Sequence, residues 1–170
     1  MKKIKILSTV FLTFGFAPAS FASDWPVWGG NGSRNMISQE KEVVMDFNPG
    51  EMDDNEKVDL STTQNVKWVA KLGSQAYGNV TIGNGCVFVG TYNVSPRETK
   101  KKGDRGVVLC LDEKTGELKW QLVIPKLGAG KVSDWEYIGV CSSPAIDGDK
   151  VYVVTNRCEV VCLDIHGLTN

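Results

Sequence analysis

The sequence predicts an all-β fold built from repeated four-stranded antiparallel units, and three observations support this prediction. Helical periodicity is nearly absent after the first 22 residues. Short runs rich in β-branched and aromatic residues alternate with Gly, Asn and Asp, which are typical of turns. Two of these runs occur twice, so the chain contains an internal repeat.

The period of this repeat matches one blade of a β-propeller. The run at 87–89 recurs 64 residues later, whereas the run at 108–112 recurs after only 52 residues. An insertion of 12 residues between Thr91 and Gly106 explains the difference, and a second excess of 12 residues precedes Pro144. Without both excesses the period is 40 residues, and a four-stranded blade takes ~40–45.

The turn residues fix where the strands begin and end. Asn84-Gly85 forms a two-residue type I′ hairpin, because this dipeptide tolerates the positive φ that such a turn requires. Gly116 takes the left-handed backbone conformation in the hairpin at 113–116. We expect strands at 78–82, 86–91, 106–112 and 117–123 in the first copy, and at 142–146, 151–155 and 158–164 in the second.

A sequence motif in the first copy points to a family. Cys110-x-Asp112-x-x-Thr115-Gly116-x-x-x-Trp120 resembles the tryptophan-docking motif A-x-D-x-x-T-G-x-x-x-W of the PQQ-like (quinoprotein alcohol dehydrogenase-like) β-propellers, with Cys in place of the first Ala. Asp112 can accept backbone N–H bonds of the turn, and Trp120 offers a flat surface to a neighbouring blade. The motif therefore favours a partial β-propeller of four-stranded antiparallel blades.

Other segments extend this resemblance over residues 66–164. Residues 66–68, which end in Trp68, look like the end of an earlier fourth strand. Residues 142–153 resemble the first strand pair of the repeat, and residues 24–30 resemble the usual beginning of exported members. The resemblance implies either a non-catalytic binding or scaffold module or, as the alternative, the N-terminal part of a PQQ-dependent dehydrogenase.

The resemblance carries no catalytic residue over to this chain. Quinoprotein dehydrogenases of the superfamily hold pyrroloquinoline quinone (PQQ) and calcium at the propeller axis, and several use a pair of adjacent cysteines. This chain has no adjacent cysteines, and none of its carboxylates matches the calcium or base positions. We therefore expect no metal site and no cofactor under the first reading, and PQQ with calcium only under the alternative.

The N-terminus has the three parts of a secretory signal. Three lysines precede an apolar stretch at 6–16, and Ser20-Phe21-Ala22 provides a small-x-small cleavage site, although cleavage after Ala19 is also allowed. We expect a signal peptide at 1–22, an N-terminal segment with an acidic linker at 23–65, and propeller repeats at 66–170. The sequence thus predicts a periplasmic or secreted protein.

Composition excludes several classes of function. The net charge is −1, and nucleic-acid binding would need clustered Lys and Arg. His166 is the single histidine. This argues against a multi-histidine metal site and against a Ser-His-Asp triad, because both need histidine side chains at the site. The apolar stretch near the N-terminus is shorter than the ~20 residues that span a bilayer, so we expect no membrane span.

The two insertions predict a binding face. Both fall on connections at the same end of the strands, and functional loops tend to lie on a rigid scaffold. The first insertion has an excess of positive charge, and the second contains Asp134-Trp135-Glu136-Tyr137. The alternative is that these insertions are ordinary solvated loops. If they form a binding face, its ligand is an unknown protein or small molecule, and the candidate residues are Tyr77, Arg97, Lys101, Trp135, Glu136 and Tyr137.

Five cysteines follow the signal. In an oxidising compartment a Cys141–Cys158 disulfide is allowed, and the alternative is that these side chains are small apolar core residues. A propeller closes on about 4–8 blades, more than this chain can hold. We expect the remaining blades from a longer chain, with several chains closing one ring as the alternative.

Overall fold

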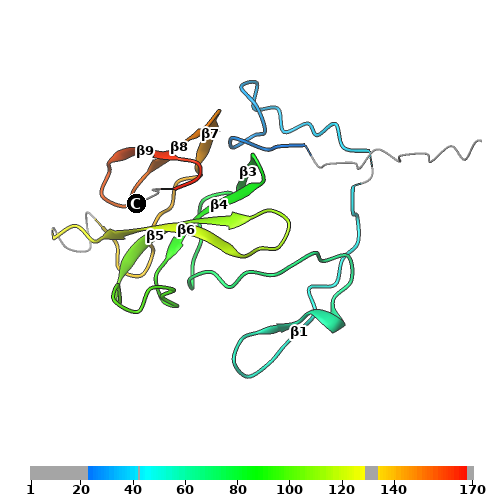
Figure 1. Cartoon of the computed structure of the whole chain (residues 1–170), viewed down its shortest axis with the longest axis horizontal. Coiled ribbons are helices and arrows are strands. Elements are labelled where there is room, and N and C mark those ends of the chain that lie inside the picture. Colours follow the sequence, from blue (N-terminus) through cyan, green and yellow to red (C-terminus); the bar gives the residue numbers. More distant parts are fainter. Residues whose placement is uncertain (1–22, 42, 129–133, 168–170) are drawn as a thin grey trace, which may run out of the picture.

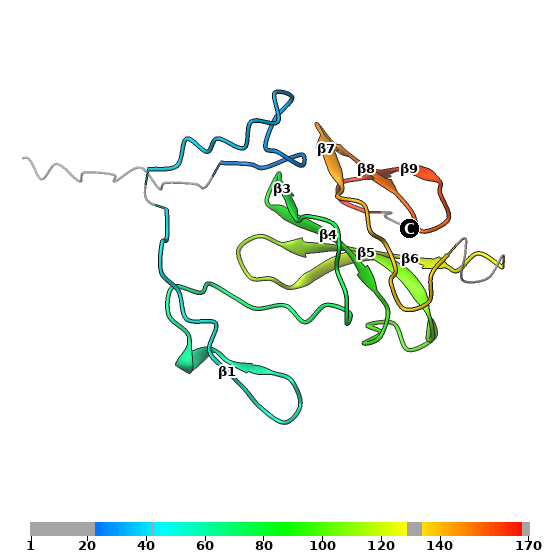
Figure 2. The same ribbon diagram turned by 180° about the vertical axis from the view of Figure 1, so that it is seen from behind.

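The computed structural model describes residues 23–41, 43–128 and 134–167, so the predicted signal peptide lies outside the described residues. In this part the protein is all-β: its strands form antiparallel sheets of four, three and two strands (Figures 1 and 2). A 3₁₀ turn at Leu60–Thr62 is the single helical element in the described ranges. None of the helical structure described is long and apolar enough to cross a membrane.

The first copy of the repeat forms one four-stranded meander, as predicted. Neighbours in sequence pair as antiparallel neighbours in the sheet. Asn84 and Gly85 have φ of 52° and 71°, and Gly116 has φ of 73°, so both predicted turns adopt the expected left-handed conformations. The strands are β3 (Thr81–Gly83), β4 (Cys86–Tyr92), β5 (Arg105–Asp112) and β6 (Leu118–Pro125).

The second copy forms a sheet of three strands, β7 (Ala145–Asp147), β8 (Lys150–Val154) and β9 (Val160–Asp164). The prediction that its third strand begins at Cys158 was wrong. Cys158 lies in the turn between β8 and β9 with φ of 59°, and its N–H donates to the carbonyl of Thr155. A separate hairpin, β1 (Glu51–Met52) and β2 (Val58–Asp59), lies in the acidic linker.

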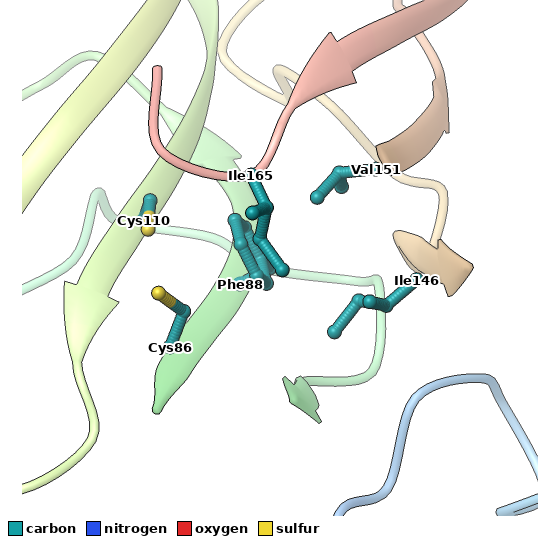
Figure 3. Close-up of a cluster of buried hydrophobic side chains, with 6 residues drawn as sticks. All are labelled: Cys86, Phe88, Cys110, Ile146, Val151 and Ile165. Atoms are coloured by element: carbon teal, nitrogen blue, oxygen red, sulfur yellow. The ribbon is translucent and has the colours of Figure 1, made fainter. Parts of the chain in front are cut away.

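The two larger sheets pack face to face through an apolar core. Figure 3 shows Phe88 of β4 between the two cysteines of β4 and β5 on one side and Ile146, Val151 and Ile165 of the second copy on the other, all in one buried cluster. Phe88 is fully buried, and burying such a side chain stabilises the fold by about 1.5–3 kcal/mol. A second cluster continues the interface with Val108, Ile124, Val140 and Val153.

The other face of the four-stranded sheet is covered by a single extended segment. Trp68, Ala70 and Leu72 pack against Val87, Val89 and other side chains of this face. We call residues 66–72 the Trp68 segment. The prediction that 66–68 ends a strand was wrong for this structure, because the segment is not paired into a sheet among the described residues.

Both tryptophans dock in the same way on the sheet that follows them. The indole N–H of Trp68 donates to the carbonyl of Glu113, and that of Trp120 donates to the carbonyl of Ile165, each at 2.9 Å. In both cases the acceptor lies 45 residues after the tryptophan in the chain. Asp112 accepts from the N–H groups of Lys114 and Thr115, as the motif predicted. The structure therefore repeats one packing arrangement twice.

The N-terminal segment joins the first strands of the two sheets. Trp25 pairs with Ile82 of β3 through two backbone hydrogen bonds of 2.8 and 3.0 Å, and the carbonyl of Pro26 accepts from the N–H of Ile146 in β7. The side chain of Asp24 accepts from the N–H of Asn84. Residues 24–26 thereby cover an edge of β3 that would otherwise be unpaired.

All five cysteines are free thiols in the structure, Cys141 and Cys158 included. Cys86 and Cys110 lie side by side in the core on neighbouring strands (Figure 3). Burial raises the pKa of the Cys110 thiol, and the nearby Cys86 raises it further. The Cys110 thiol is therefore held in the protonated, unreactive form.

The contact between Gly116 and Trp68 can be tested by substitution. Gly85 and Gly116 have nearly the same positive φ, but a Cβ at Gly116 would lie 2.6 Å from the Trp68 ring, whereas a Cβ at Gly85 meets nothing within 4 Å. We expect Gly85→Ala to cost ~1–2 kcal/mol from the left-handed backbone alone, and Gly116→Ala to cost a further ~1–3 kcal/mol from overpacking. Chemical denaturation measures both, and equal losses would contradict this docking.

The reactivity of the cysteines provides a second test. We expect native Cys86 and Cys110 to resist a short pulse of iodoacetamide, because both are fully buried and burial raises the pKa of Cys110. The exposed Cys158 and Cys162 should be alkylated in the same pulse, which peptide mass spectrometry would quantify. Labelling in guanidinium is the control that exposes all five; rapid labelling of Cys86 in the native protein would show that the core is assigned wrongly.

Candidate binding face

Thr91, at the end of β4, brings the two crossing connections together. Its hydroxyl accepts from the N–H of Gly73 and donates to the carbonyl of Gln75, at 3.0 and 2.9 Å. Its carbonyl accepts from the N–H of Val140. The segments before β3 and before β7 are therefore both fixed to one buried residue, at the end of the sheets where the binding face was predicted.

A cluster of polar side chains supports the second crossing. Lys126, directly after β6, donates to Asp134 at 2.7 Å and lies 3.7 Å from Asp104. The second oxygen of Asp134 accepts from the N–H of Leu127 and from the amide of Asn156. These contacts join the connections after β4 and β6 to the turn after β8, so the cluster ties both sheets together at this end.

Asp134 remains charged although it is buried. Its side chain is 4% exposed, and burial alone would raise the pKa of this carboxyl. Hydrogen bonds from Lys126, Asn156 and the N–H of Leu127 outweigh that effect, and they hold the pKa of Asp134 below its usual range. The ion pair with Lys126 is therefore kept at neutral and mildly acidic pH.

Tyr137 is held on this cluster from two sides. Its N–H donates to Asp104 at 3.0 Å, and its ring packs edge-on against Tyr92 with centroids 5.7 Å apart. Burial raises the pKa of Tyr92, and the negative charge of Asp104 raises it further. Tyr137 as a residue remains more than half exposed, so a fixed aromatic residue is presented to the solvent.

Trp135 is the second aromatic side chain presented on this connection. Its carbonyl accepts from Lys126 at 2.6 Å, which fixes the backbone, while the residue as a whole is 63% exposed. Glu136 lies between Trp135 and Tyr137 on the exposed surface. The predicted residues 135–137 are thus held on the polar cluster that contains Lys126 and Asp104.

The remaining predicted residues are placed differently. Tyr77 is exposed on the first crossing, which Thr91 joins to the second. Lys101 is exposed and forms an ion pair with Glu98 at 3.1 Å. The guanidinium of Arg97 instead bonds to the carbonyl of Lys71, so Arg97 points toward the Trp68 segment rather than toward the exposed aromatic rings.

Four residues support this face but were not among the candidate residues, although Asp134 was noted in the second insertion. They are polar, and two of them directly flank a strand at the same end of the sheets: Asp104 precedes β5 and Lys126 follows β6. That position could have indicated these two, whereas the contacts within the cluster join residues up to 22 positions apart in the chain. They are Asp104, Lys126, Asp134 and Asn156.

A groove of about 620 Å³ lies elsewhere, between the β1–β2 hairpin and the Trp68 segment. Met52, Leu60, Val69 and other apolar side chains line it. Lys71 bonds to Glu56 at 2.6 Å beside the groove. This groove contains none of the predicted binding residues.

We expect Asp134→Asn to lower the stability by about 1–3 kcal/mol at neutral pH, because the partly buried Lys126 loses the closer of its two charged partners. The carboxyl has its pKa lowered in the folded state, below the ~3.9 of an unfolded Asp. Its contribution is present above that value and is lost as the pH falls through the folded pKa. The difference in Tm from wild type should therefore shrink below about pH 4.

The control is Asp54→Asn, which removes an exposed carboxylate and should leave Tm nearly unchanged at every pH. Thermal unfolding across the acidic range measures both variants. Two results would contradict the role given to this cluster. One is an Asp134→Asn variant as stable as wild type at pH 7, and the other is a difference in Tm from wild type that grows as the pH falls.

Within the ranges that the structure describes, no group of three or more His, Cys, Asp or Glu side chains could hold a metal ion. No family model matches the chain, and no curated protein matches it. The fold and this face are therefore the basis on which a function is proposed.

Proposed function

We propose that this chain is an exported PQQ-like β-propeller repeat protein that acts as a non-catalytic binding or scaffold module. Support comes from the repeated docking of Trp68 and Trp120, each through an indole N–H bond to the sheet that follows it. Sheets stacked in this way, each a meander of about four strands, are the units from which propellers are built. Residues 1–22, outside the described residues, act in this proposal as the signal for export.

The observation that carries the binding function is the support under residues 135–137. Exposed aromatic side chains on flexible loops lose entropy when they bind, but here the backbone is fixed by Lys126 and Asp104. Aromatic side chains in fixed positions are typical of binding hot spots. We infer that Trp135 and Tyr137 contact the partner directly.

The charge at the same end of the sheets indicates the chemistry of the partner. The connection after β4 carries Lys100, Lys101 and Lys102, all exposed, on the same end of the sheets. A partner with an apolar or flat group for the rings and an acidic group for the lysines satisfies both features. We propose an acidic, aromatic-containing peptide segment or small molecule of that kind.

The alternative proposal is that the chain is part of a PQQ-dependent dehydrogenase. No described residue can be given a role in such an enzyme. The described residues hold no carboxylate cluster to which calcium could be assigned. We therefore assign no residue of this chain to a quinone or calcium site and derive no reaction step.

The binding proposal is tested by screening the protein against a library of short peptides that combine acidic and aromatic residues. We expect Trp135→Ala to weaken every bound peptide at least tenfold, since truncating a hot spot costs about 2 kcal/mol or more. Lys101→Glu should weaken binding by repulsion, with an effect that decreases at high salt.

The matched control is Trp28→Ala, because Trp28 is similarly exposed, at 52%, but lies in the N-terminal segment. Fluorescence titration of the peptides would measure all three variants. Binding that is unaffected by both Trp135→Ala and Lys101→Glu would refute this face as the site.

A further inference from the structure

The chain contains the dipeptide Asn-Gly twice, at Asn31-Gly32 and at Asn84-Gly85. In this dipeptide the backbone nitrogen of glycine can attack the side-chain amide carbon of asparagine, because glycine has no Cβ that obstructs the approach. The structure places the two dipeptides in different turns, with different hydrogen bonds to the two asparagine side chains. These hydrogen bonds determine which asparagine can react.

The amide oxygen of Asn31 accepts two hydrogen bonds from Ser33. The backbone N–H of Ser33 donates at 2.9 Å, and its hydroxyl donates at 2.6 Å. Both donors therefore meet the oxygen that becomes negatively charged when a nucleophile adds to the amide carbon. Donors held at the position of a developing oxyanion lower the barrier to such an addition. Ser33 thus activates the side-chain amide of Asn31.

The attacking group and the leaving group of this reaction are both free. Among the described residues, none accepts a hydrogen bond from the N–H of Gly32 or from the side-chain nitrogen of Asn31. Both residues are exposed, and a Cβ at Gly32 would meet nothing within 4 Å. Water can therefore reach the amide, and ammonia can leave.

The turn around Asn31 is held in place by its neighbours. The N–H of Gly30 donates to the carbonyl of Val27 at 2.9 Å, and the N–H of Arg34 donates to the carbonyl of Asn31 at 3.0 Å. The ring of Trp25 lies directly against Gly30, where a Cβ would be only 2.8 Å from the ring. The backbone of Trp25 is itself paired with β3. The contact between Ser33 and Asn31 is therefore part of a fixed turn.

Asn84 is held in the opposite way. Its side-chain nitrogen donates to the carbonyl of Gly148 at 2.8 Å, and its backbone N–H donates to Asp24 at 3.3 Å. No described residue donates a hydrogen bond to its amide oxygen. The leaving nitrogen is thus bound to the second sheet, and the oxyanion would form without a donor. We expect Asn84 to be stable in the folded protein.

We propose that Asn31-Gly32 is a site of self-modification, at which Asn31 is converted to aspartate and isoaspartate with Ser33 as the activating residue. Either product adds a negative charge to the turn that follows residues 24–26, which pair with β3 and β7. This modification is independent of the proposed binding function. It requires only this chain and water.

The atoms of the reaction balance without an oxidant or a reductant. The backbone nitrogen of Gly32 forms a bond to Cγ of Asn31 and loses its proton to water. The bond from Cγ to the side-chain nitrogen then breaks, and this nitrogen takes up a proton and leaves as ammonia. Water opens the resulting succinimide at either of its carbonyls, which gives aspartate or isoaspartate.

The first experiment compares the two dipeptides within one molecule. The folded protein is incubated at mildly alkaline pH in water labelled with heavy oxygen, so that peptide mass spectrometry counts only conversion during the incubation. We expect labelled aspartate and isoaspartate at Asn31 and none at Asn84. Incubation in guanidinium is the control, in which both sites should react because the fold no longer distinguishes them. An unchanged Asn31 in the folded protein, or an Asn84 that reacts equally fast, would overturn the proposal.

The second experiment tests the role of Ser33. Ser33→Ala removes the hydroxyl donor and should slow conversion of Asn31 in the folded protein about 2- to 10-fold, the effect of one lost hydrogen bond. It should leave the rate in guanidinium unchanged. Ser33→Thr is the matched control, since it keeps the hydroxyl and should keep most of the rate. Equal rates for folded wild type and Ser33→Ala would reject Ser33 as the activating residue and with it the proposal.

The third experiment tests the backbone attack. Gly32 has space for a Cβ and lies outside the left-handed region, so Gly32→Ala should fold normally, which circular dichroism would check. The added methyl group crowds the attacking nitrogen, and we expect conversion to slow strongly. An unchanged rate, or aspartate formed without isoaspartate in wild type, would indicate direct hydrolysis of the side chain and would contradict the proposed route.

Discussion

The docking of an indole ring onto the next sheet is the interaction on which the rest of this structure depends. Each sheet has two apolar faces, and a sheet cannot leave both in water without exposing a large hydrophobic area. Trp120 covers part of one face and donates its N–H to a carbonyl of the following sheet. Apolar contact thus fixes the distance between the sheets, and the hydrogen bond fixes their relative position.

The burial of the strands differs between the two copies because different segments cover their faces. Every residue of β4 is buried, because the Trp68 segment covers one side of the sheet and the second copy covers the other. In β8, by contrast, buried residues alternate with half-buried or exposed ones. The same repeat therefore gives a two-sided core in one copy and a one-sided core in the other, depending only on what packs against it.

The position of the candidate binding face follows from the same stacking. Antiparallel strands place alternate connections at opposite ends, so the long connections of both copies meet at one end. There the buried Thr91 and the Lys126–Asp134 ion pair join segments from both sheets. Aromatic side chains on these connections are held by the core beneath them, which is the arrangement that a binding surface requires.

The sequence alone determined the local features of the first copy. Asn84-Gly85, Gly116 and the alternation of β-branched residues define turns and strands through nearest neighbours, and four strands appear within a few residues of the expected limits. The repeat offset also identified Trp68 and Trp120 as equivalent residues. These features depend on backbone conformations and spacings that neighbouring residues fix.

Only the tertiary structure decided the features that depend on distant partners. Residues 66–68 have the composition of a strand but lack a partner to pair with, and Cys158 belongs to a turn because the β8–β9 connection needs a left-handed residue there. The support of Asp104, Lys126, Asp134 and Asn156 joins three separate connections. Hydrogen bonds across such separations depend on how the sheets stack; the docking motif indicates that Trp120 packs on a neighbouring sheet, but no local pattern specifies which side chains meet at the ends of the strands.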